Sequence, residues 1–307
     1  ACVPITSQRD INGTNSVSRE ITLQFNYTSA TERCAWTVPS TIDKIAIAVV
    51  GGGGGGGHSY LQTYDESLSG YYVGGGGGAG EVLYNPSLSV TPNTSHLIEV
   101  GSGGAGASDS NAISNSSSTV SAQTGRDTKF GNSITAKGGG AGGYFYAPLN
   151  VAIQGQSGGS GGGSIGNIMS GGTVVSNGAG SWAPSTVPAG WQSFGSPGEE
   201  SIIQNLVDGN GNPAGNINWG GRGGGAMGVS GDTARGIFIF DQCLATGGSG
   251  SVRKLKQTWR TEFLAIASSE QKTATGCADI SRNAAGIANS SITVSYTHLT
   301  LPTNREV

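Results

Sequence analysis

The chain has 307 residues, and 56 of them are glycine, about 18% against the roughly 7% of an average protein. Glycine runs such as residues 51–57 break any Gly-X-Y period, and only 10 residues are proline, so a collagen helix is excluded. Disordered chains combine high net charge with few apolar residues, whereas this chain has a net charge of −3 and 35% hydrophobic residues. Composition therefore predicts a folded chain.

Two further classes are disfavoured by the distribution of apolar and charged residues. The longest apolar stretches, residues 45–50 and 236–240, have the length of a strand and fall far below the roughly 20 residues of a membrane-spanning helix. Recognition of nucleic acid needs Lys and Arg clustered on one surface, which a chain near neutrality does not favour. We expect no membrane span and no nucleic-acid partner.

Short β patterns alternate with the glycine blocks along the chain. Residues 21–27 place apolar side chains at every second position, as a half-buried strand requires. A second alternating stretch, residues 42–49, leads directly into the glycine run 51–57. Residues 261–272 carry a weak helical stripe. Further strands are expected at residues 81–84, 87–90, 96–100, 133–136, 237–240, 251–255 and 291–297. The pattern predicts an all-β chain.

The four cysteines form no CxxC motif, so zinc and thioredoxin-like sites do not fit their spacing. Structural disulfides fit better. Three pairings are open, and the similar gaps favour Cys2 with Cys34 and Cys243 with Cys277. The chain also begins at Ala1 without Met, as a secreted protein does after its signal is removed. We expect an extracellular protein, secreted or at the cell surface.

Asn-x-Ser/Thr sequons supply candidate glycan acceptors if the host glycosylates its exported proteins. Their number is close to that expected by chance in a chain rich in Ser and Thr, so the number carries no weight. The acceptors are Asn12, Asn26, Asn93, Asn115 and Asn289.

A series of motifs in a fixed order resembles a known family. Phe-Asn-Tyr-Thr (25–28), Trp-Thr-Val-Pro (36–39) and Lys-Ile-Ala-Ile-Ala-Val-Val (44–50) precede the first glycine run. Related segments follow at residues 74–81, 90–92, 98–106 and 129–143. The series resembles the glycine-rich domain of phage tail tips, bacterial surface proteins and some animal receptor ectodomains, over about residues 20–252. The chain departs from the family at Asn93, where glycine is usual, and at residues 195–219, which form a long insertion.

The resemblance implies a jelly-roll-like β-sandwich whose long connections are bundled polyglycine II helices. Physical reasoning supports such a bundle. A threefold extended helix rises about 3.1 Å per residue and has no internal hydrogen bonds, so its N–H and C=O groups need partners on neighbouring segments. Glycine segments can supply them because no Cβ keeps the backbones apart. Ordering glycine costs much conformational entropy, so strands and disulfides are needed to anchor the ends.

The distribution of glycine divides the chain into three parts. Residues 1–19 form an N-terminal arm able to donate a strand to a neighbour, and residues 20–252 form the glycine-rich β domain. Residues 253–307 form a C-terminal β element or a strand meant for a neighbour. Within this last part, residues 295–307 resemble translated sequencing-adapter read-through, so we expect the natural chain to differ from about Ser295 onward.

Patterns that resemble catalytic motifs are explained by glycine abundance. Residues 101–106 fit GxGxxG, but such matches recur by chance at this abundance and no βαβ unit follows. GxSxG occurs at Ser157, Ser160 and Ser164, and three matches in one repetitive run argue against all three. Residues 208–212 begin like a calcium loop, but a proline replaces the required glycine. The histidines, His58, His96 and His298, lack ligand-type neighbours at metal spacing. We expect no catalytic residue, cofactor or metal, and no enzyme.

Aromatic residues near the glycine runs are the better functional signal. Rigid aromatic rings on loops held by a stiff scaffold suit binding of sugars or protein partners. The alternative is that these rings pack over the faces of the glycine bundle. The candidate ligand contacts are Tyr60, Tyr64, Tyr71, Tyr72, Tyr144, Tyr146, Trp182 and Trp191.

Two functions of different class follow. The first is a non-enzymatic extracellular structural or adhesive protein, the subunit of a surface filament or fibril that assembles into a homopolymer by strand addition. The second is a receptor-binding adhesin at the tip of a phage tail fibre, which the family's occurrence and the aromatic loops suggest. Disulfides weigh against the second, because phage proteins assemble in a reducing cytoplasm. In either case a glycan or another cell-surface ligand is the expected partner.

Overall fold

The computed structural model describes residues 3–12, 17–28, 33–58, 60–63, 69–109, 119–146, 151–168, 174–176, 178–207, 210–211, 213–226, 237–239, 242–244, 252–255, 261–262 and 291–300. Within these residues the secondary structure is β throughout, and the strand pairs are antiparallel. The predicted all-β class is confirmed. The described part of the chain contains no helix long and apolar enough to cross a membrane.

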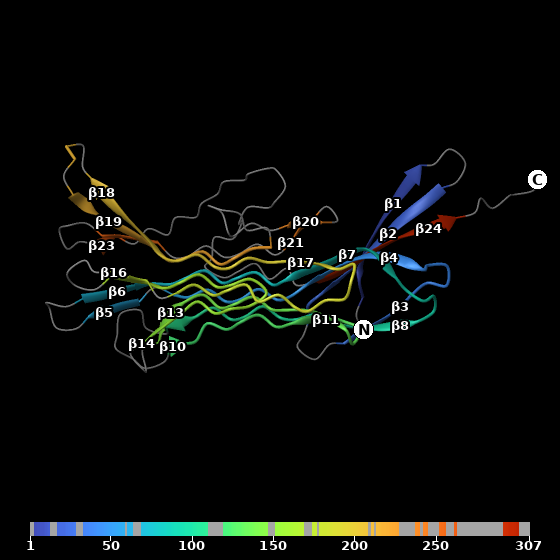
Figure 1. Ribbon diagram of the computed structural model, residues 1–307, viewed down its shortest axis with the longest axis horizontal. Helices are drawn as coiled ribbons and strands as arrows, with labels where there is room; N and C mark the ends of the chain where they lie inside the picture. The colour runs from blue at the N-terminus through green and yellow to red at the C-terminus, as the bar shows by residue number, and fades with distance from the viewer. Residues whose placement is uncertain are drawn as a thin grey trace, which may run out of the picture.

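A six-stranded sheet forms one layer at the end of the molecule that holds the N-terminus (Figure 1). The chain's last described strand lies inside this sheet rather than at its edge. Residues 81–84 and 87–90, expected as two strands, belong to one strand that pairs with its neighbour across a register shift between Ile45 and Ile47. In spatial order the strands are β1 (Ile5–Asn12), β2 (Val17–Asn26), β24 (Ser291–Thr300), β4 (Lys44–Val50), β7 (Val82–Ser89) and β17 (Gln192–Phe194).

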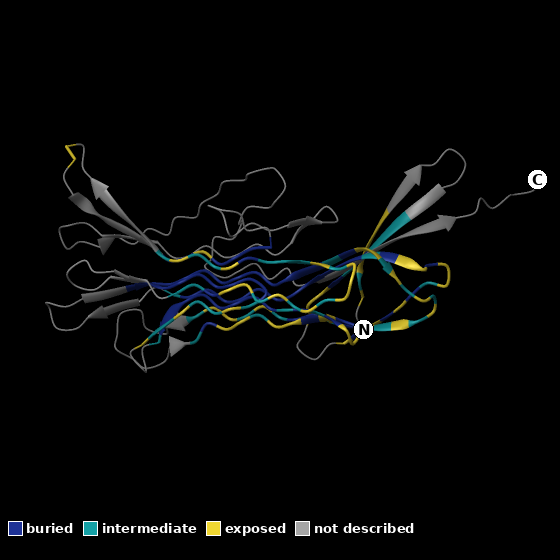
Figure 2. Ribbon diagram, in the orientation of Figure 1, coloured by how far each residue is buried: buried dark blue, intermediate teal, exposed yellow. Residues whose placement is uncertain are grey.

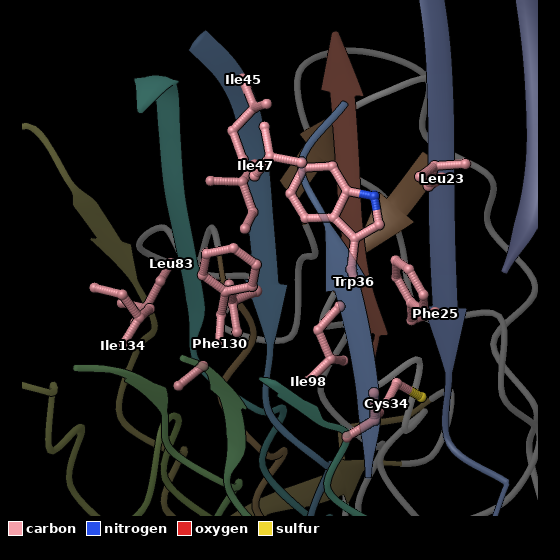
Figure 3. Packing of buried hydrophobic residues seen from close by; sticks show 14 of the residues in the cluster. Leu23, Phe25, Cys34, Trp36, Ile45, Ile47, Leu83, Ile98, Phe130 and Ile134 are labelled. Carbon is pink, nitrogen blue, oxygen red and sulfur yellow. The ribbon is translucent and has the colours of Figure 1, made fainter. Parts of the chain in front are cut away.

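A four-stranded sheet faces the first one, and the two share a hydrophobic core (Figure 3). Its order is β12 (Ile134–Ala136), β11 (Thr128–Phe130), β8 (Ser95–Glu99) and β3 (Cys34–Thr37). The alternation predicted for residues 21–27 and 42–49 supplies the core from one side. Two sheets with a common core form a β-sandwich, while the jelly-roll order of its strands stays a prediction. The core residues include Leu23, Phe25, Ile45, Ile47, Val49 and Leu83 from the first sheet and Cys34, Trp36, Ile98, Phe130 and Ile134 from the second.

The N-terminal arm pairs within its own chain. β1 forms an antiparallel hairpin with β2, from Ile5 opposite Gln24 to Asn12 opposite Val17. Opposite charges lie directly across from each other in this register, Arg9 across from Glu20 and Asp10 across from Arg19, which favours this pairing. The role of the arm as a strand donor to a neighbour stays a prediction.

Antiparallel hairpins occupy the end of the molecule opposite the N-terminus (Figure 1). They comprise β5 (Tyr60–Thr63) with β6 (Ser69–Val73), β9 (Ser108–Asp109) with β10 (Thr119–Val120), β13 (Tyr144–Tyr146) with β14 (Val151–Ile153), β15 (Gly166–Ile168) with β16 (Val174–Ser176), and β18 (Ile202–Val207) with β19 (Pro213–Trp219). We call these the end hairpins. β15 also pairs with β6, and β19 is extended by β22 (Val252–Leu255) and β23 (Thr261–Glu262).

The remaining expected elements differ little from the structure. The strand predicted at residues 237–240 is β20 (Ile237–Ile239), which pairs with β21 (Gln242–Leu244). The weak helical stripe at 261–272 begins instead with β23, and its remainder lies outside the described residues. The backbone pairing of β24 includes residues 295–300, whose sequence resembles adapter read-through.

Glycine-rich segments run between the sandwich and the end hairpins, except that residues 154–165 join two strands of the end hairpins, β14 and β15. Figure 2 shows much of this middle region as buried. We call it the glycine bundle, and it comprises residues 51–57, 74–80, 101–107, 121–127, 137–143, 154–165, 178–183, 195–201 and 220–226. The insertion at 195–219, which did not fit the family pattern, is one further excursion of this kind.

Candidate functional site

Hydrogen bonds in the glycine bundle repeat every three residues. The N–H groups of the first segment reach the carbonyls of the second in reverse order, as expected for antiparallel neighbours. The bonds run from Gly51 to Glu81 at 3.0 Å, from Gly54 to Gly78 at 2.7 Å and from Gly57 to Gly75 at 2.8 Å.

The same segment binds other neighbours with the same spacing. Gly52 donates to Arg126 and Gly55 donates to Gln123, both at 2.9 Å. In return the carbonyls of Gly52 and Gly55 accept bonds from Gly139 and Gly142, at 2.8 and 2.9 Å. A period of three with every bond made to a neighbour is the geometry of the threefold extended helix that the resemblance implied.

Close backbone approach explains why these positions are glycine. A Cβ placed on Gly54 would overlap the carbonyl oxygen of Gly140, and one on Gly77 would overlap that of Gly54. Such contacts are closer than 3.0 Å and meet backbone rather than flexible side chains, so the segments would have to move apart. Gly106 differs, since its Cβ would come no closer than 3.5 Å to the Gly56 oxygen. Glycine is therefore a packing requirement at the inner positions and not at every position.

Serine side chains within the bundle bind backbone groups. Ser160 and Ser164 are fully buried, and their hydroxyl oxygens accept bonds from the N–H groups of Ser196 at 3.3 Å and Ser201 at 2.5 Å. The Ser157 hydroxyl lies 2.8 Å from that of Ser181 and accepts the Ser181 N–H at 3.2 Å. All three serines of the GxSxG matches thus fasten neighbouring segments together.

A buried carboxylate lies where the second glycine segment enters β7. Glu81 is 0% exposed. Its Oε1 accepts the Ser185 N–H at 2.9 Å and the Ser193 hydroxyl at 2.5 Å, and its Oε2 accepts the Lys137 N–H at 3.0 Å and the Ser185 hydroxyl at 2.5 Å. Four donors from three separate stretches of chain converge on one side chain. Sequence reasoning missed this group, although an isolated acid between a glycine run and an apolar strand was the available signal.

Two further side chains cap bundle segments at the sandwich. The Thr128 hydroxyl, fully buried, accepts the N–H of Gly101 at 3.0 Å, and the Asp127 carboxylate accepts the N–H of Gly138 at 3.0 Å. The side chains of Glu81 and Thr128 thus fasten the bundle to the sandwich, and Asp127 joins two bundle segments beside it. These contacts supply the anchors that the entropy of ordering glycine demands.

The structure buries two of the aromatic residues predicted to contact a ligand. Tyr72 is buried and stacks on Phe145 with ring centroids 4.1 Å apart, and Tyr144 is buried against Ala141. For these two rings the packing alternative holds, since Tyr72 clusters with Phe145 and Ile165 and Tyr144 clusters with Ala122 and Ala141.

The other aromatic residues are distributed between the core and the surface. Tyr146 is partly buried beside Tyr144, and Trp191 packs partly buried against the sandwich core. Trp182 is 39% exposed. Tyr60 and Tyr71 lie on β5 and β6, with nothing described of their side chains, and Tyr64 lies outside the described residues.

The predicted modification sites are described only in part. Asn26 and Asn93 have exposed side chains, Asn12 is the last residue of β1, and Asn115 and Asn289 lie outside the described residues. Asn93 has a φ of 63°, in the left-handed region where asparagine is the best substitute for glycine, which explains its departure from the family pattern.

Cys34 is buried in the core and is disulfide-bonded. Cys243 lies on β21, with nothing described of its side chain, while Cys2 and Cys277 lie outside the described residues. Both predicted pairings stay predictions.

His96 stands in a row of rings on the four-stranded sheet. It stacks on Phe130 with centroids 4.9 Å apart and faces Trp36 at 6.3 Å. Burial lowers the pKa of His96 below its ordinary value of 6.5. Among the described residues no group of three or more His, Cys, Asp or Glu could hold a metal ion.

A family model described as a glycine-rich domain matches residues 28–289. The chain belongs to this glycine-rich domain family. No curated protein and no solved structure matches the chain. In this chain, the glycine that dominates the composition forms a hydrogen-bonded bundle between a β-sandwich and a set of hairpins.

Proposed function

We propose that this glycine-rich domain protein is a non-enzymatic extracellular structural and adhesive protein, the subunit of a surface filament that assembles by strand addition between neighbours. The observation that carries the proposal is the three-residue hydrogen-bond repeat of the glycine bundle. Each inner segment is bonded to several neighbours, so the bundle resists bending in more than one direction. It acts as a stiff spacer between the sandwich and the end hairpins.

The polar groups within the described bundle support a mechanical role. The buried serines and Asp127 fasten segments to one another, and Glu81 and Thr128 tie them to the sandwich. The disulfide of Cys34 supports an oxidising compartment, because disulfides persist outside the cytosol. Together these features favour a secreted protein that bears mechanical load.

Adhesion is the role we propose for the end hairpins. The five hairpins carry a single charged residue on their described strands, Asp109, among aromatic, aliphatic and amide side chains, while Arg253, Lys254 and Glu262 lie on β22 and β23, which extend β19. Uncharged strands rich in Tyr, Asn and Gln suit a neutral surface ligand such as a glycan, since aromatic faces and amides bind sugar C–H and O–H groups together. Loops held on a stiff scaffold are common binding sites.

A second candidate is a receptor-binding adhesin at the tip of a phage tail fibre. The position of the end hairpins at one extreme of the molecule favours it, because a tip protein must present its loops away from its attachment point (Figure 1). The Cys34 disulfide weighs against this candidate, since virion proteins assemble in the cytoplasm.

Electron microscopy of the protein exported through an oxidising compartment tests the proposal. We expect helical polymers of uniform width, together with peptide maps that contain Cys2 joined to Cys34 and Cys243 joined to Cys277. A chain that stays monomeric at all concentrations contradicts the filament, and a single copy or trimer at a virion tip establishes the second candidate.

A further inference from the structure

The C-terminal strand completes the centre of the larger sheet. β24 pairs along its whole length with β2, from Ser291 opposite Asn26 to Thr300 opposite Val17. Its first half pairs on the other side with β4, from Ser291 opposite Val50 to Ser295 opposite Ala46. β2 and β4 belong to the N-terminal part of the chain, so the last strand fills a slot between two of the earliest.

The slot is part of the hydrophobic core. Ile292 lies in register with the buried residues Phe25 and Val49, and Val294 lies in register with Leu23 and Ile47. β24 also lies against β11 of the facing sheet. Without β24, β2 and β4 would stand roughly 10 Å apart, with their facing N–H and C=O groups unpaired. The sandwich is therefore incomplete until a strand with this pattern occupies the slot.

The strand enters from the far end of the molecule. β23, the element before it, lies among the end hairpins, while β24 lies in the sandwich at the opposite end (Figure 1). Residues 263–290 join the two, and fully extended they can span roughly 90 Å. A bundle segment of seven glycine residues extends only about 22 Å at the rise of polyglycine II. Because the connection can span several times that length, it can reach a neighbouring molecule as well as its own sandwich.

We propose that β24 is the exchanged strand of the filament: in the polymer, the slot between β2 and β4 of each subunit is filled by β24 of the next copy. This inference rests on the proposed filament function and names the strand that joins its subunits. The same β24 that fills the slot within one chain fits the slot of another, because the two slots are identical. Exchange preserves every contact of the sandwich while it links the chains.

The position of donor and slot favours an open polymer over a closed dimer. The connection to β24 leaves from the end hairpins, and the slot lies at the other end. Reciprocal exchange between two copies would require them to lie antiparallel side by side. If the hairpin end of one copy lies against the sandwich of the next, each β24 fills one slot and each slot receives one β24. Such a heterologous contact can repeat along an open polymer without limit.

β24 is a better donor than the N-terminal arm. β1 is an edge strand, so its removal exposes a new edge but leaves the sheet continuous. The β1–β2 register also places Arg9 opposite Glu20 and Asp10 opposite Arg19, an order of charges that favours this pairing. Ile292 and Val294, the positions that match the core rows, precede the adapter-like residues that begin at about Ser295.

Cysteine pairs across the two seams test the inference. Gln24 lies opposite Thr293 across the β2–β24 seam, and Ser7 lies opposite Thr22 across the β1–β2 seam. Chains carrying only Q24C are co-assembled with chains carrying only T293C, and the polymer is oxidised and run on a denaturing gel without reductant. The matched control co-assembles S7C chains with T22C chains. In each mixture a new crosslink can form only between two chains.

We expect interchain dimers in the Q24C and T293C mixture and none above background in the control. A synthetic peptide of residues 291–300, added in excess during assembly, should shorten the polymers several-fold, whereas a scrambled peptide should not. Polymers that form without Q24C–T293C crosslinks overturn the inference and leave the filament standing. Crosslinks in the S7C and T22C mixture alone assign the exchange to the arm instead. Closed dimers joined through Q24C–T293C overturn head-to-tail assembly, and a chain that forms no assembly overturns the inference and the filament together.

Discussion

The Oε2 atom of Glu81 accepts a hydrogen bond of 3.0 Å from the N–H of Lys137, a residue that begins a different bundle segment. With the two bonds from Ser185 and the one from Ser193, this carboxylate joins the second glycine segment, the fifth segment and the strand that edges the larger sheet. A single side chain thereby fixes the junction between bundle and sandwich.

Replacing Glu81 with glutamine should destabilise the fold. The amide NH₂ takes the place of one carboxylate oxygen and there faces one backbone N–H and one serine hydroxyl. The hydroxyl can turn to accept from the NH₂, but the buried N–H loses its acceptor, at a cost of about 1–3 kcal/mol. Chemical denaturation of E81Q against wild type measures the effect. Glu200 is exposed, and E200Q is the matched control, with an expected change below about 0.5 kcal/mol. Equal stabilities of E81Q and E200Q would sink this account of the junction.

Alanine substitutions should separate inner from outer glycine positions. Gly54→Ala drives a methyl group into the Gly140 carbonyl, so it should cost about 3 kcal/mol or more or prevent folding. Gly106→Ala meets only the Gly56 oxygen at 3.5 Å, and it should change stability by less than about 1 kcal/mol, in the stabilising direction if the unfolded chain loses entropy. Thermal melts of both variants decide the matter, and a harmless G54A would show that the segments are loosely packed.

The Thr128 hydroxyl should be required at the entry of the third glycine segment. Thr128→Val keeps the shape but leaves the buried N–H of Gly101 without an acceptor, which should cost about 1–3 kcal/mol. Thr128→Ser keeps the hydroxyl and should lose less. If valine and serine prove equally stable in denaturant titrations, the bond contributes nothing.

His96 should make stability fall as the solution is acidified. Burial holds its pKa in the folded protein below 6.5, so the unfolded chain binds a proton first when pH falls through that value. The free energy of unfolding should therefore decrease from about pH 7.5 downward, and the decrease stops once His96 is also protonated in the folded state. His96→Gln should show a shallower slope over the same range. Parallel slopes for the two proteins would assign the pH dependence to other groups.

Amide hydrogen exchange should reveal a stiff bundle. Gly54 and Gly55 are buried and donate to Gly78 and Gln123, so their exchange should be slow and comparable with that of β4. Gly103 and Gly106 lie on the exposed side of the third segment and should exchange faster. Fast exchange at all four glycines is the result expected of a flexible linker and would contradict the bundle.

Local patterns predicted much of the fold. The alternating residues 21–27 and 42–49 became core strands, and the ordered glycine runs indicated bundled extended segments. Short strand patterns were less informative about where one strand ends and the next begins. Residues 81–84 and 87–90 merged because β7 accommodates one extra residue between the partners of Ile45 and Ile47, a register shift that no local pattern reveals. Residue type alone left open whether Tyr72 and Tyr144 bind a ligand or pack, and burial in two apolar clusters decides for packing.

The sequence by itself determined the strand faces and the location of the glycine segments, since both depend on period and on the absence of Cβ over short stretches. The tertiary structure alone decided which segments are neighbours, that Glu81 receives donors from three stretches of chain, and that β24 lies between β2 and β4. Those relationships join residues far apart in the chain, and their specificity resides in backbone hydrogen bonds. Backbone groups are the same at every residue, so the identity of the partners becomes visible only when the chain is folded.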